Sequence, residues 1–397
     1  MSTGGPANRV DKSRRLLQHH TAAARQARGK QRVVSKSSRR IAVIVPGMLG
    51  STLVDSRGRI LWSDDMLANY QSILADPSSI KWYPSSEPAS GEVITQFKFM
   101  YFRTDVWTRF YEEILWRDFP PDDRIEFGYD WRDDILRSAQ RLMETLASRR
   151  GVGPQFSLRS RRPAEAPTLV FFTHSMGSHV VRVALGSGEL HPSWIDRLIH
   201  VAPALKGMPL MFRVLYKAPT LPLLETFFWL RYLPNGGEYH RVLLAAIRTF
   251  PAAFQVLPPP PLHYIRTQGG PLFNPLRRRC IPAAMRDRAS QAHRLLDAAS
   301  GMIGRARLPA FSVYTDPYLE LGKQTEIQYD ARPSGRRPNC RYEIDKVLRR
   351  TTSGDSLVPA SSASPAETRS TKVRNADHNV MCDHPKVVEA VKAFLVR

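Results

Sequence analysis

Short apolar runs alternate with amphipathic stretches over most of the chain after residue 40. Ile41–Val45 is a β-branched run that stops at Pro46-Gly47, which is typical of a buried strand followed by a turn. Further strands are predicted at Arg124–Phe127, Thr168–Phe172, Leu198–Val201, Ala310–Tyr314 and Thr371–Val373. Helical spacing of apolar residues predicts helices at 133–149, Ser178–Leu185 and Pro385–Leu395. This alternation predicts an α/β fold with a mostly parallel central sheet and helices on both faces.

Residues 204–300 interrupt the alternation. They hold an apolar, aromatic-rich stretch, then Pro258–Pro261, then the basic Arg277–Arg279. We therefore predict four segments: a basic tail at 1–40, the first part of the core at 41–203, an inserted cap or lid at 204–300, and the second part of the core at 301–397. Residues 52–123 are mixed in pattern, with tryptophans scattered among Pro and Ser, and are not assigned to elements.

Charge is concentrated at the beginning of the chain. The chain has 58 Lys and Arg against 36 Asp and Glu, a net charge of +22. Eleven of these cations and only Asp11 among the acids lie in residues 1–40, so this segment contributes +10. Such a segment buries too little apolar surface to fold alone, and we expect a disordered tail. Its charge favours peripheral contact with an anionic membrane; aromatic side chains are absent, which makes nucleic acid an unlikely partner. A solvated tail without a partner is the alternative.

Several other classes of protein are disfavoured. The first 30 residues lack the apolar run of a signal peptide, and charges interrupt Met208–Leu233, so no transmembrane helix is expected. We expect a cytoplasmic or peripheral membrane protein. Cys280, Cys340 and Cys382 lie far apart without CxxC spacing, which predicts neither a metal site nor a disulfide framework. No cofactor is predicted.

The strongest chemical signal is Thr168-Leu-Val-Phe-Phe-Thr-His-Ser-Met-Gly177, an apolar strand that leads through Ser-x-Gly into a helix. A nucleophile elbow needs this context, because the serine must lie on a tight turn with its hydroxyl above the sheet. Thr173 stands where the usual motif has its first glycine. Ser175 is therefore predicted as a nucleophile, and a helix N-cap serine is the alternative.

A nucleophilic serine needs a histidine that is oriented by a carboxylate, in the chain order serine, acid, histidine. His378 lies late in the chain, after a predicted strand and before the last helix, whereas its rival His384 precedes Pro385 and is better placed to begin that helix. Asp355 follows a glycine and precedes Val358-Pro359, a setting typical of the acid. Asp316 and Asp377 remain alternatives for the acid.

Acyl transfer also needs donors for the developing oxyanion. We expect one from the backbone N–H of Met176 and the other from that of Met48, in the loop Val45-Pro-Gly-Met-Leu-Gly-Ser51. Taken alone, this loop is also compatible with a phosphate-binding nest, although no lysine follows to make a P-loop.

A set of motifs occurs in the order found in one enzyme family. They are Pro46-Gly-Met-Leu-Gly-Ser51, Tyr129-Asp-Trp-Arg132, His174-Ser-Met-Gly177, Ala202-Pro-Ala-Leu-Lys-Gly207, Gln255-Val-Leu-Pro258, Gly354-Asp355, Val358-Pro359 and His378. Over roughly residues 41–397 the chain resembles the lecithin:cholesterol acyltransferase-like family, which includes phospholipid:diacylglycerol acyltransferases and lysosomal acyl-transferring phospholipases. The resemblance implies an α/β-hydrolase fold with a cap and mobile lid, a Ser/Asp/His triad, and an acyl-enzyme formed from an ester lipid.

The chain departs from this family in three places, one of which is its early aromatic-rich region. Gly354-Asp-Ser-Leu-Val358 replaces the family's Gly-Asp-Gly-Thr/Ser-Val, although Asp355 remains. No cysteine precedes Cys280, so the N-terminal disulfide of secreted members has no counterpart. The expected fold and triad do not depend on these features. The identity of the substrate and of the acyl acceptor does not follow from the resemblance.

The leading hypothesis is a serine-dependent acyltransferase or lipase that passes a fatty acyl group from an ester lipid, through Ser175, to an alcohol or water. Trp131, Met208, Phe212 and Phe228 are predicted to contact the substrate; the alternative for the apolar stretch after residue 207 is an ordinary packed core of the cap. Two other functions stay open. One is a carboxylesterase that acts on small esters, and the other is a membrane- or nucleic-acid-binding protein with a basic tail on an inactive hydrolase scaffold.

Overall fold

The computed structural model describes residues 39–84, 91–149, 152, 156–216, 235–266, 270–277, 281–316, 325–333 and 342–396. The chain divides into two units, Met1–Ser38 and Arg39–Arg397. The first unit contains nearly all of the predicted basic tail and lies outside the described residues. Every element named below belongs to the second unit.

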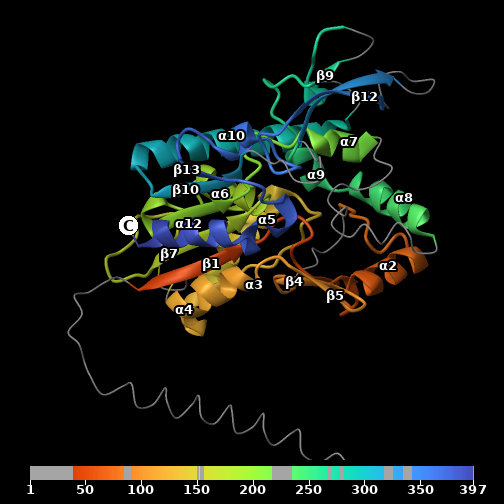
Figure 1. Cartoon of the computed structure of the whole chain (residues 1–397). Helices are drawn as coiled ribbons and strands as arrows, with labels where there is room; N and C mark the ends of the chain where they lie inside the picture. Colours follow the sequence, from red (N-terminus) through yellow and green to blue (C-terminus); the bar gives the residue numbers. More distant parts are fainter. Residues whose placement is uncertain are drawn as a thin grey trace, which may run out of the picture. The chain divides into compact units, whose positions relative to one another are not determined.

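Six parallel strands form the central sheet (Figure 1). Their order across the sheet is β13 (Arg369–Val373), β10 (Ala310–Thr315), β8 (Ile195–Val201), β7 (Thr168–His174), β1 (Arg40–Val45) and β6 (Arg124–Glu126). Every strand predicted from the sequence is present, and the prediction of a mostly parallel sheet is confirmed. Residues 41–45 of β1 are fully buried, because a parallel sheet is covered on both faces.

Helices cover the two faces of this sheet. On one face, α5 (Ile135–Ser148) and α10 (Ala283–Ala306) flank α6 (Gly177–Gly186), which lies against β1 and β7. On the other, α12 (Pro385–Leu395) contacts β8, β10 and β13, and the helical segment α3 (Thr108–Phe110), η2 (Tyr111–Leu115) and α4 (Trp116–Asp118) lies beside it (Figure 1). The predicted last helix coincides with α12, whose first residue is a proline, as is common at the start of a helix.

Residues 51–123 form small elements that the sequence pattern did not predict. Two hairpins, β2 (Leu53–Val54) with β3 (Ile60–Trp62) and β4 (Gln96–Phe99) with β5 (Phe102–Asp105), flank α2 (Met66–Ala75). The N-cap of α2 is Asp65, whose carboxylate accepts the N–H groups of Leu67 and Ala68. η3 (Pro121–Asp123) then leads into β6.

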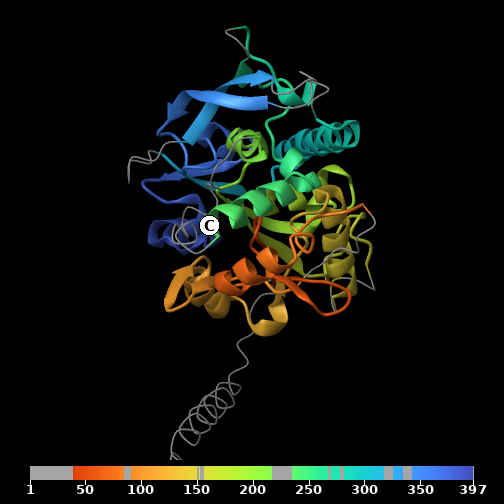
Figure 2. The same cartoon turned by 90° about the vertical axis from the view of Figure 1, so that its right-hand side faces the viewer.

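The predicted insertion contributes α7 (Leu210–Tyr216), α8 (Gly236–Ile247), α9 (Pro251–Gln255), β9 (Ile265–Arg266) and η6 (Pro275–Arg277). β9 joins β11 (Thr325–Pro333) and β12 (Tyr342–Thr351) in a second, three-stranded sheet. Figure 2 shows α8, in green, between the orange α2 below and the blue strands above. The predicted boundary at residue 300 falls inside α10, which packs on α6 of the core.

The remaining elements connect these parts. They are η4 (Pro192–Trp194), α11 (Ala360–Ala363) and η8 (His378–Asp383). None of the helices in the described ranges combines the length and the apolar character that a bilayer span requires.

Candidate active site

Ser175 lies on the sharp turn between β7 and α6. Its φ angle is +49°, in the left-handed region that side chains rarely adopt, and its N–H donates to the carbonyl of Val201 on β8 (3.0 Å). The helix N-cap is Met176, so the structure does not use Ser175 as a cap. Gly177 is required here: a Cβ at this position would lie 2.3 Å from the carbonyl oxygen of Val45 and 2.5 Å from that of Pro46.

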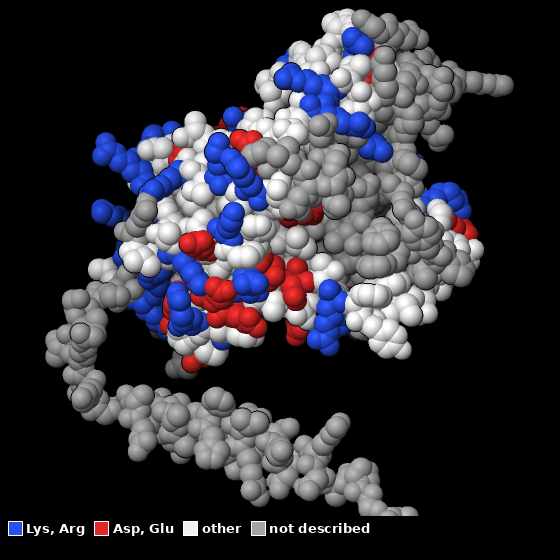
Figure 3. Space-filling model, viewed as in Figure 1, with Lys and Arg blue, Asp and Glu red and all other residues white. Residues whose placement is uncertain are grey.

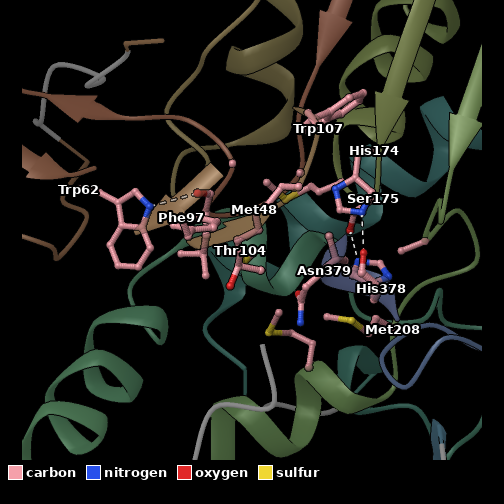
Figure 4. A pocket seen from close by; sticks show the side chains of 18 residues that line it. Met48, Trp62, Phe97, Thr104, Trp107, His174, Ser175, Met208, His378 and Asn379 are labelled. Atoms are coloured by element: carbon pink, nitrogen blue, oxygen red, sulfur yellow. Dashed lines mark hydrogen bonds between the residues drawn. The ribbon is translucent and has the colours of Figure 1, made fainter. Parts of the chain in front are cut away.

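His378, the first residue of η8, places its ring beside Ser175 (Figure 4). Its Nε2 lies 2.9 Å from Ser175 Oγ, and its Nδ1 lies 2.7 Å from Oδ2 of Asp355. Burial lowers the pKa of His378, but the charge of Asp355 and its hydrogen bond, together with the charge of Asp377, outweigh burial and raise the pKa above its ordinary value of 6.5. The imidazole is thus held as a stronger base than an isolated histidine.

Asp355 is buried in the turn between β12 and α11. Its Oδ1 accepts the N–H groups of Leu357 (3.2 Å) and Val358 (2.7 Å), which leaves Oδ2 for the histidine. In addition, the N–H of His378 donates to the Asp355 carbonyl (3.2 Å). The altered Gly354-Asp-Ser-Leu-Val358 turn therefore still presents the carboxylate to the imidazole.

The alternative residues lie in other roles. Oδ1 of Asp377 accepts the N–H of Asn379 (3.1 Å) and caps η8, while Asp316 follows β10 and donates its N–H to the carbonyl of Val373 (3.0 Å). His384 is the N-cap residue of α12, in agreement with the expectation that it begins that helix.

His174, directly before the nucleophile, has a role that the sequence analysis did not assign. Its Nε2–H donates to the carbonyl of His378 (3.0 Å), and the two rings lie 5.1 Å apart between centroids. Burial, with a further contribution from the nearby His378, lowers the pKa of His174 to about 3. The ring is therefore neutral at physiological pH, and its N–H fastens the loop that carries His378 beside the serine.

The loop after β1 brings Met48 to the same place. Gly47 lets this loop approach closely, because a Cβ there would lie 3.0 Å from Ser175 Cβ. Met48 and Met176 both line the cavity with Ser175, and neither backbone N–H has a hydrogen-bond partner within the described part of the chain. Two free N–H donors beside a serine hydroxyl are what an oxyanion site needs.

Three aromatic side chains hold this loop in shape. The hydroxyl of Tyr129 donates to the carbonyl of Pro46 (2.9 Å), the indole N–H of Trp131 to that of Ser51 (3.1 Å), and the indole N–H of Trp62 to that of Leu49 (3.1 Å). Two residues of the Tyr-Asp-Trp-Arg motif, Tyr129 and Trp131, thus fix the expected oxyanion loop by hydrogen bonds to its carbonyls. Within the motif, Arg132 and Asp130 form a buried ion pair (2.8 Å).

The serine opens into a cavity with mostly apolar walls, shown in Figure 4, that encloses about 850 Å³ including its open mouth. The walls come from five regions: the loop after β1, the two hairpins, the segment before α3, the part of the chain after β8, and the loop that carries His378. The residues are Met48, Leu49, Trp62, Phe97, Thr104, Val106, Trp107, Ala204, Met208, Met211, Val256 and Asn379.

The predicted substrate contacts lie in different places. Met208 lines the cavity. Trp131 is fully buried behind Trp62, with its ring edge-on to it (centroids 5.6 Å apart), because its indole N–H is committed to the loop carbonyl. Phe212 is buried against Tyr216 and Tyr264 instead of the cavity. Phe228 lies outside the described residues.

Metal-ligating side chains do not cluster within the described ranges, where no group of three or more His, Cys, Asp or Glu is placed to hold an ion.

Comparisons with known proteins support the fold. No family model and no curated protein matches the sequence. The structure is similar to a chain in the crystal structure of the Tle4–Tli4 complex, with a TM-score of 0.52 and 11% identity over 91% of this chain and 98% of that one. Weaker similarities, with TM-scores of 0.40 and 0.35, are to the Bacillus licheniformis lipase BlEst2 (9% identity, 93% and 95% of the two chains) and the metagenomic carboxyl esterase MGS0156 (17% identity, 93% and 79%). Together with the parallel sheet and its elbow turn, the similarity to the chain of the Tle4–Tli4 complex shows that this protein has an α/β-hydrolase fold.

Proposed function

We propose that this protein is a serine-dependent ester hydrolase or acyltransferase that works through an acyl-enzyme on Ser175. The observation that carries the proposal is the continuous hydrogen-bonded chain from Ser175 Oγ to His378 (2.9 Å) and on to Asp355 (2.7 Å), at the floor of an apolar cavity. A serine is a poor nucleophile without an oriented base, and this chain supplies one.

The first half-reaction follows from the roles of the atoms. Asp355 accepts the Nδ1–H of His378, so Nε2 is free to accept the proton of the Ser175 hydroxyl as Oγ bonds to the ester carbonyl carbon. The N–H groups of Met48 and Met176 hold the oxyanion that forms. When the carbonyl is restored, the bond to the leaving alkoxide breaks, and His378 gives its proton to that alkoxide. The acyl group remains on Ser175.

The second half-reaction repeats these steps with a new acceptor. Water or an alcohol gives a proton to His378 Nε2, its oxygen bonds to the acyl carbon, and the Ser175 Oγ leaves and recovers the proton. With water as the acceptor the product is a fatty acid, whereas an alcohol acceptor gives a new ester. The chemistry is the same for both, so the acceptor that enters the cavity decides between hydrolase and transferase.

Two features support a lipid ester as the substrate. The cavity walls next to Ser175 are apolar, with Trp62, Phe97, Met208 and Met211 suited to an acyl chain. The motifs described above resemble those of the lecithin:cholesterol acyltransferase-like family, whose members act on ester lipids. On this basis we propose phospholipids or acylglycerols as acyl donors.

Product analysis with phosphatidylcholine carrying a labelled acyl chain tests the proposal, with and without an added long-chain alcohol. We expect labelled fatty acid without the alcohol, and a labelled ester of the alcohol when it is present. Turnover of short-chain esters alone would favour the carboxylesterase function.

Two serine variants provide the controls for this assay. Ser175→Ala should remove both products, whereas Ser187→Ala at the far end of α6 should keep them, because among the described residues the Ser187 hydroxyl bonds only to the carbonyl of Ala184 and the N–H of Glu189. Activity of Ser175→Ala equal to that of the wild type would exclude the proposed nucleophile. If the wild-type protein turned over no ester, the proposal that it is an ester hydrolase or acyltransferase would be refuted.

A further inference from the structure

Three consecutive large apolar side chains project from the end of the β4–β5 hairpin. Met100, Tyr101 and Phe102, which we call the hairpin tip, are 63%, 94% and 55% exposed. On the same hairpin Phe97 and Phe99 point inward and are buried, so the strands obey the usual alternation while the tip does not follow it. Contiguous apolar exposure of this kind marks an interaction site more often than scattered single residues do.

The backbone of the turn indicates that this exposure serves a purpose. Phe99 pairs with Phe102, so Met100 and Tyr101 form a two-residue turn. Met100 has a φ angle of +53°, and such hairpin positions strongly favour glycine or asparagine. A large apolar side chain is thus kept where a small residue would relieve the backbone, and strain of this kind is concentrated at functional positions.

The other end of the hairpin forms part of the active-site cavity. Phe97 on β4 and Thr104 on β5 line the cavity, and Val106 just beyond β5 does so too. Thr104 lies three positions after Tyr101, which corresponds to a rise of about 10 Å along a strand. A surface that receives the hairpin tip therefore lies about 10 Å from the cavity wall.

Cations accompany the hairpin tip. Lys98 and Arg103 form a cross-strand pair on the exposed side of the hairpin, although like charges in this position repel each other. An ion pair between Lys98 and Asp64 (2.5 Å) offsets part of that repulsion. Figure 3 shows uncharged surface next to Lys and Arg side chains at the lower right, where Figure 1 places the hairpin and α2. Apolar and aromatic side chains flanked by cations are typical of segments that bind membrane surfaces.

From these observations we infer that the hairpin tip inserts into a lipid surface and holds the mouth of the cavity against it, so that a lipid ester enters directly from that surface. The inference rests on the proposed function. A protein partner fits less well, because three side chains offer far less than the roughly 800 Å² that each side of a specific protein interface contributes. A lipid surface needs no complementary shape, and the net charge of +22 favours surfaces with anionic headgroups.

Binding to phosphatidylcholine vesicles at high salt tests the inference, because this lipid and salt suppress purely electrostatic attraction by other basic segments. The full-length chain with Ser175→Ala is used, so that the lipid is not consumed. Adding Met100→Ser, Tyr101→Ser and Phe102→Ser should lower the partition coefficient about a hundredfold, since each apolar side chain that enters the lipid contributes up to about tenfold. Tyr101→Trp alone should preserve binding.

A matched control comes from another exposed apolar residue. Leu262, which is 44% exposed and lies near β9, should tolerate replacement by serine with less than about a twofold change in binding. With Ser175 intact, the triple hairpin variant should turn over a water-soluble short-chain ester at the wild-type rate, because the hairpin tip does not line the cavity.

The outcomes separate the two proposals. Equal vesicle binding by the triple variant and its parent would overturn the inference about the hairpin tip, and so would an equal loss in Leu262→Ser. Neither result would touch the proposed function, which is tested by ester turnover. Absence of turnover in the wild type would overturn the proposed function, while the vesicle assay with Ser175→Ala would still report on the hairpin tip.

Discussion

Replacing Asp355 by asparagine changes one atom of the proposed triad and inverts the proton positions of the rest. In the structure, Oδ1 of Asp355 accepts two backbone N–H groups, from Leu357 and Val358, and Oδ2 accepts the Nδ1–H of His378. The asparagine carbonyl should keep the two backbone donors, because the opposite orientation would direct its NH₂ group at them. The NH₂ group then faces His378 Nδ1, which must become the acceptor.

This reversal removes the base. With Nδ1 as acceptor, the proton of the neutral imidazole moves to Nε2, the atom that lies 2.9 Å from Ser175 Oγ. Nε2–H can donate to the hydroxyl but cannot take its proton. Loss of the correct tautomer in an otherwise intact triad costs about 10⁴ in kcat, which corresponds to roughly 5.5 kcal/mol of transition-state stabilisation. Turning the amide over would restore the tautomer at the cost of two buried hydrogen bonds, each worth about 1 kcal/mol or more.

The measurement is kcat/KM for a water-soluble ester with the Asp355→Asn, Asp377→Asn and Asp316→Asn variants. We expect a fall of 10³-fold or more, by order of magnitude, only for Asp355→Asn, and less than about tenfold for the other two. Circular dichroism and thermal unfolding verify that the three variants are folded. Equal losses in Asp355→Asn and Asp377→Asn would refute the reasoning, because Asp377 caps η8 and does not hold the imidazole N–H in this geometry.

Two further predictions follow from the same site. The acid limb of the pH profile of kcat/KM should have its midpoint above pH 6.5, because His378 acts as a neutral base and loses activity as the pH falls through its raised pKa. In Asp355→Asn the limb should move to lower pH, since the lowering effect of burial is then opposed only by the charge of Asp377, and a limb that stays in place would contradict this assignment. Gly177→Ala should destabilise the protein by about 1–3 kcal/mol in urea unfolding and lower kcat, because its Cβ would meet the Val45 carbonyl, whereas Gly304→Ala on α10 meets no atom within 4 Å and should be neutral or stabilising; equal unfolding midpoints for the two variants would refute the steric argument.

Much of the core could be predicted because its signals are local. β7 and the turn to α6 lie in one continuous segment, in which an apolar run, a serine and a glycine follow each other directly. The same holds for β13, η8 and α12, which fix the position of His378 by a short run of chain. Asp355 was then predicted from its place between them in the chain and from its local setting, after a glycine and before Val358-Pro359. These elements are strands and helices whose ends are set by neighbouring residues, so the pattern of the sequence describes them well.

The walls of the cavity could not be predicted in the same way. Trp62, Phe97 and Thr104 lie on strands of three or four residues, too short for periodicity to stand out. The β4–β5 turn has Met100 and Tyr101 where a hairpin usually announces itself with asparagine or glycine, so its signal is missing from the sequence. The support that Trp131 gives to the loop could not be predicted for a related reason: its indole N–H bonds to a carbonyl 80 residues earlier, and nothing local in the sequence reveals that contact.

Thr173, which replaces the first glycine of the usual elbow motif, shows how the fold tolerates one departure and not another. At Gly177 an added Cβ would meet backbone carbonyls that cannot move aside. At position 173 the side chain points instead toward β8, where Thr173 Oγ1 lies 2.7 Å from Nδ1 of His200 and 3.3 Å from the carbonyl of Ile199. The hydroxyl is therefore buried with both of its hydrogen-bonding capacities used.

His200, the partner of Thr173, is held in its neutral state by burial and by Arg182 on α6, the helix that follows Ser175. Burial, together with the charge of Arg182 on α6, keeps the pKa of His200 well below its ordinary value, so the ring is neutral. Arg182 Nε–H donates to His200 Nε2 (3.1 Å), which leaves the ring proton on Nδ1 to donate to Thr173, while Glu367 balances the buried guanidinium. The hydrogen bonds of the Thr173 hydroxyl thus depend on residues of β8 and α6 together. A sequence motif that requires glycine at this position would miss a nucleophile elbow in which a buried threonine is fully hydrogen-bonded.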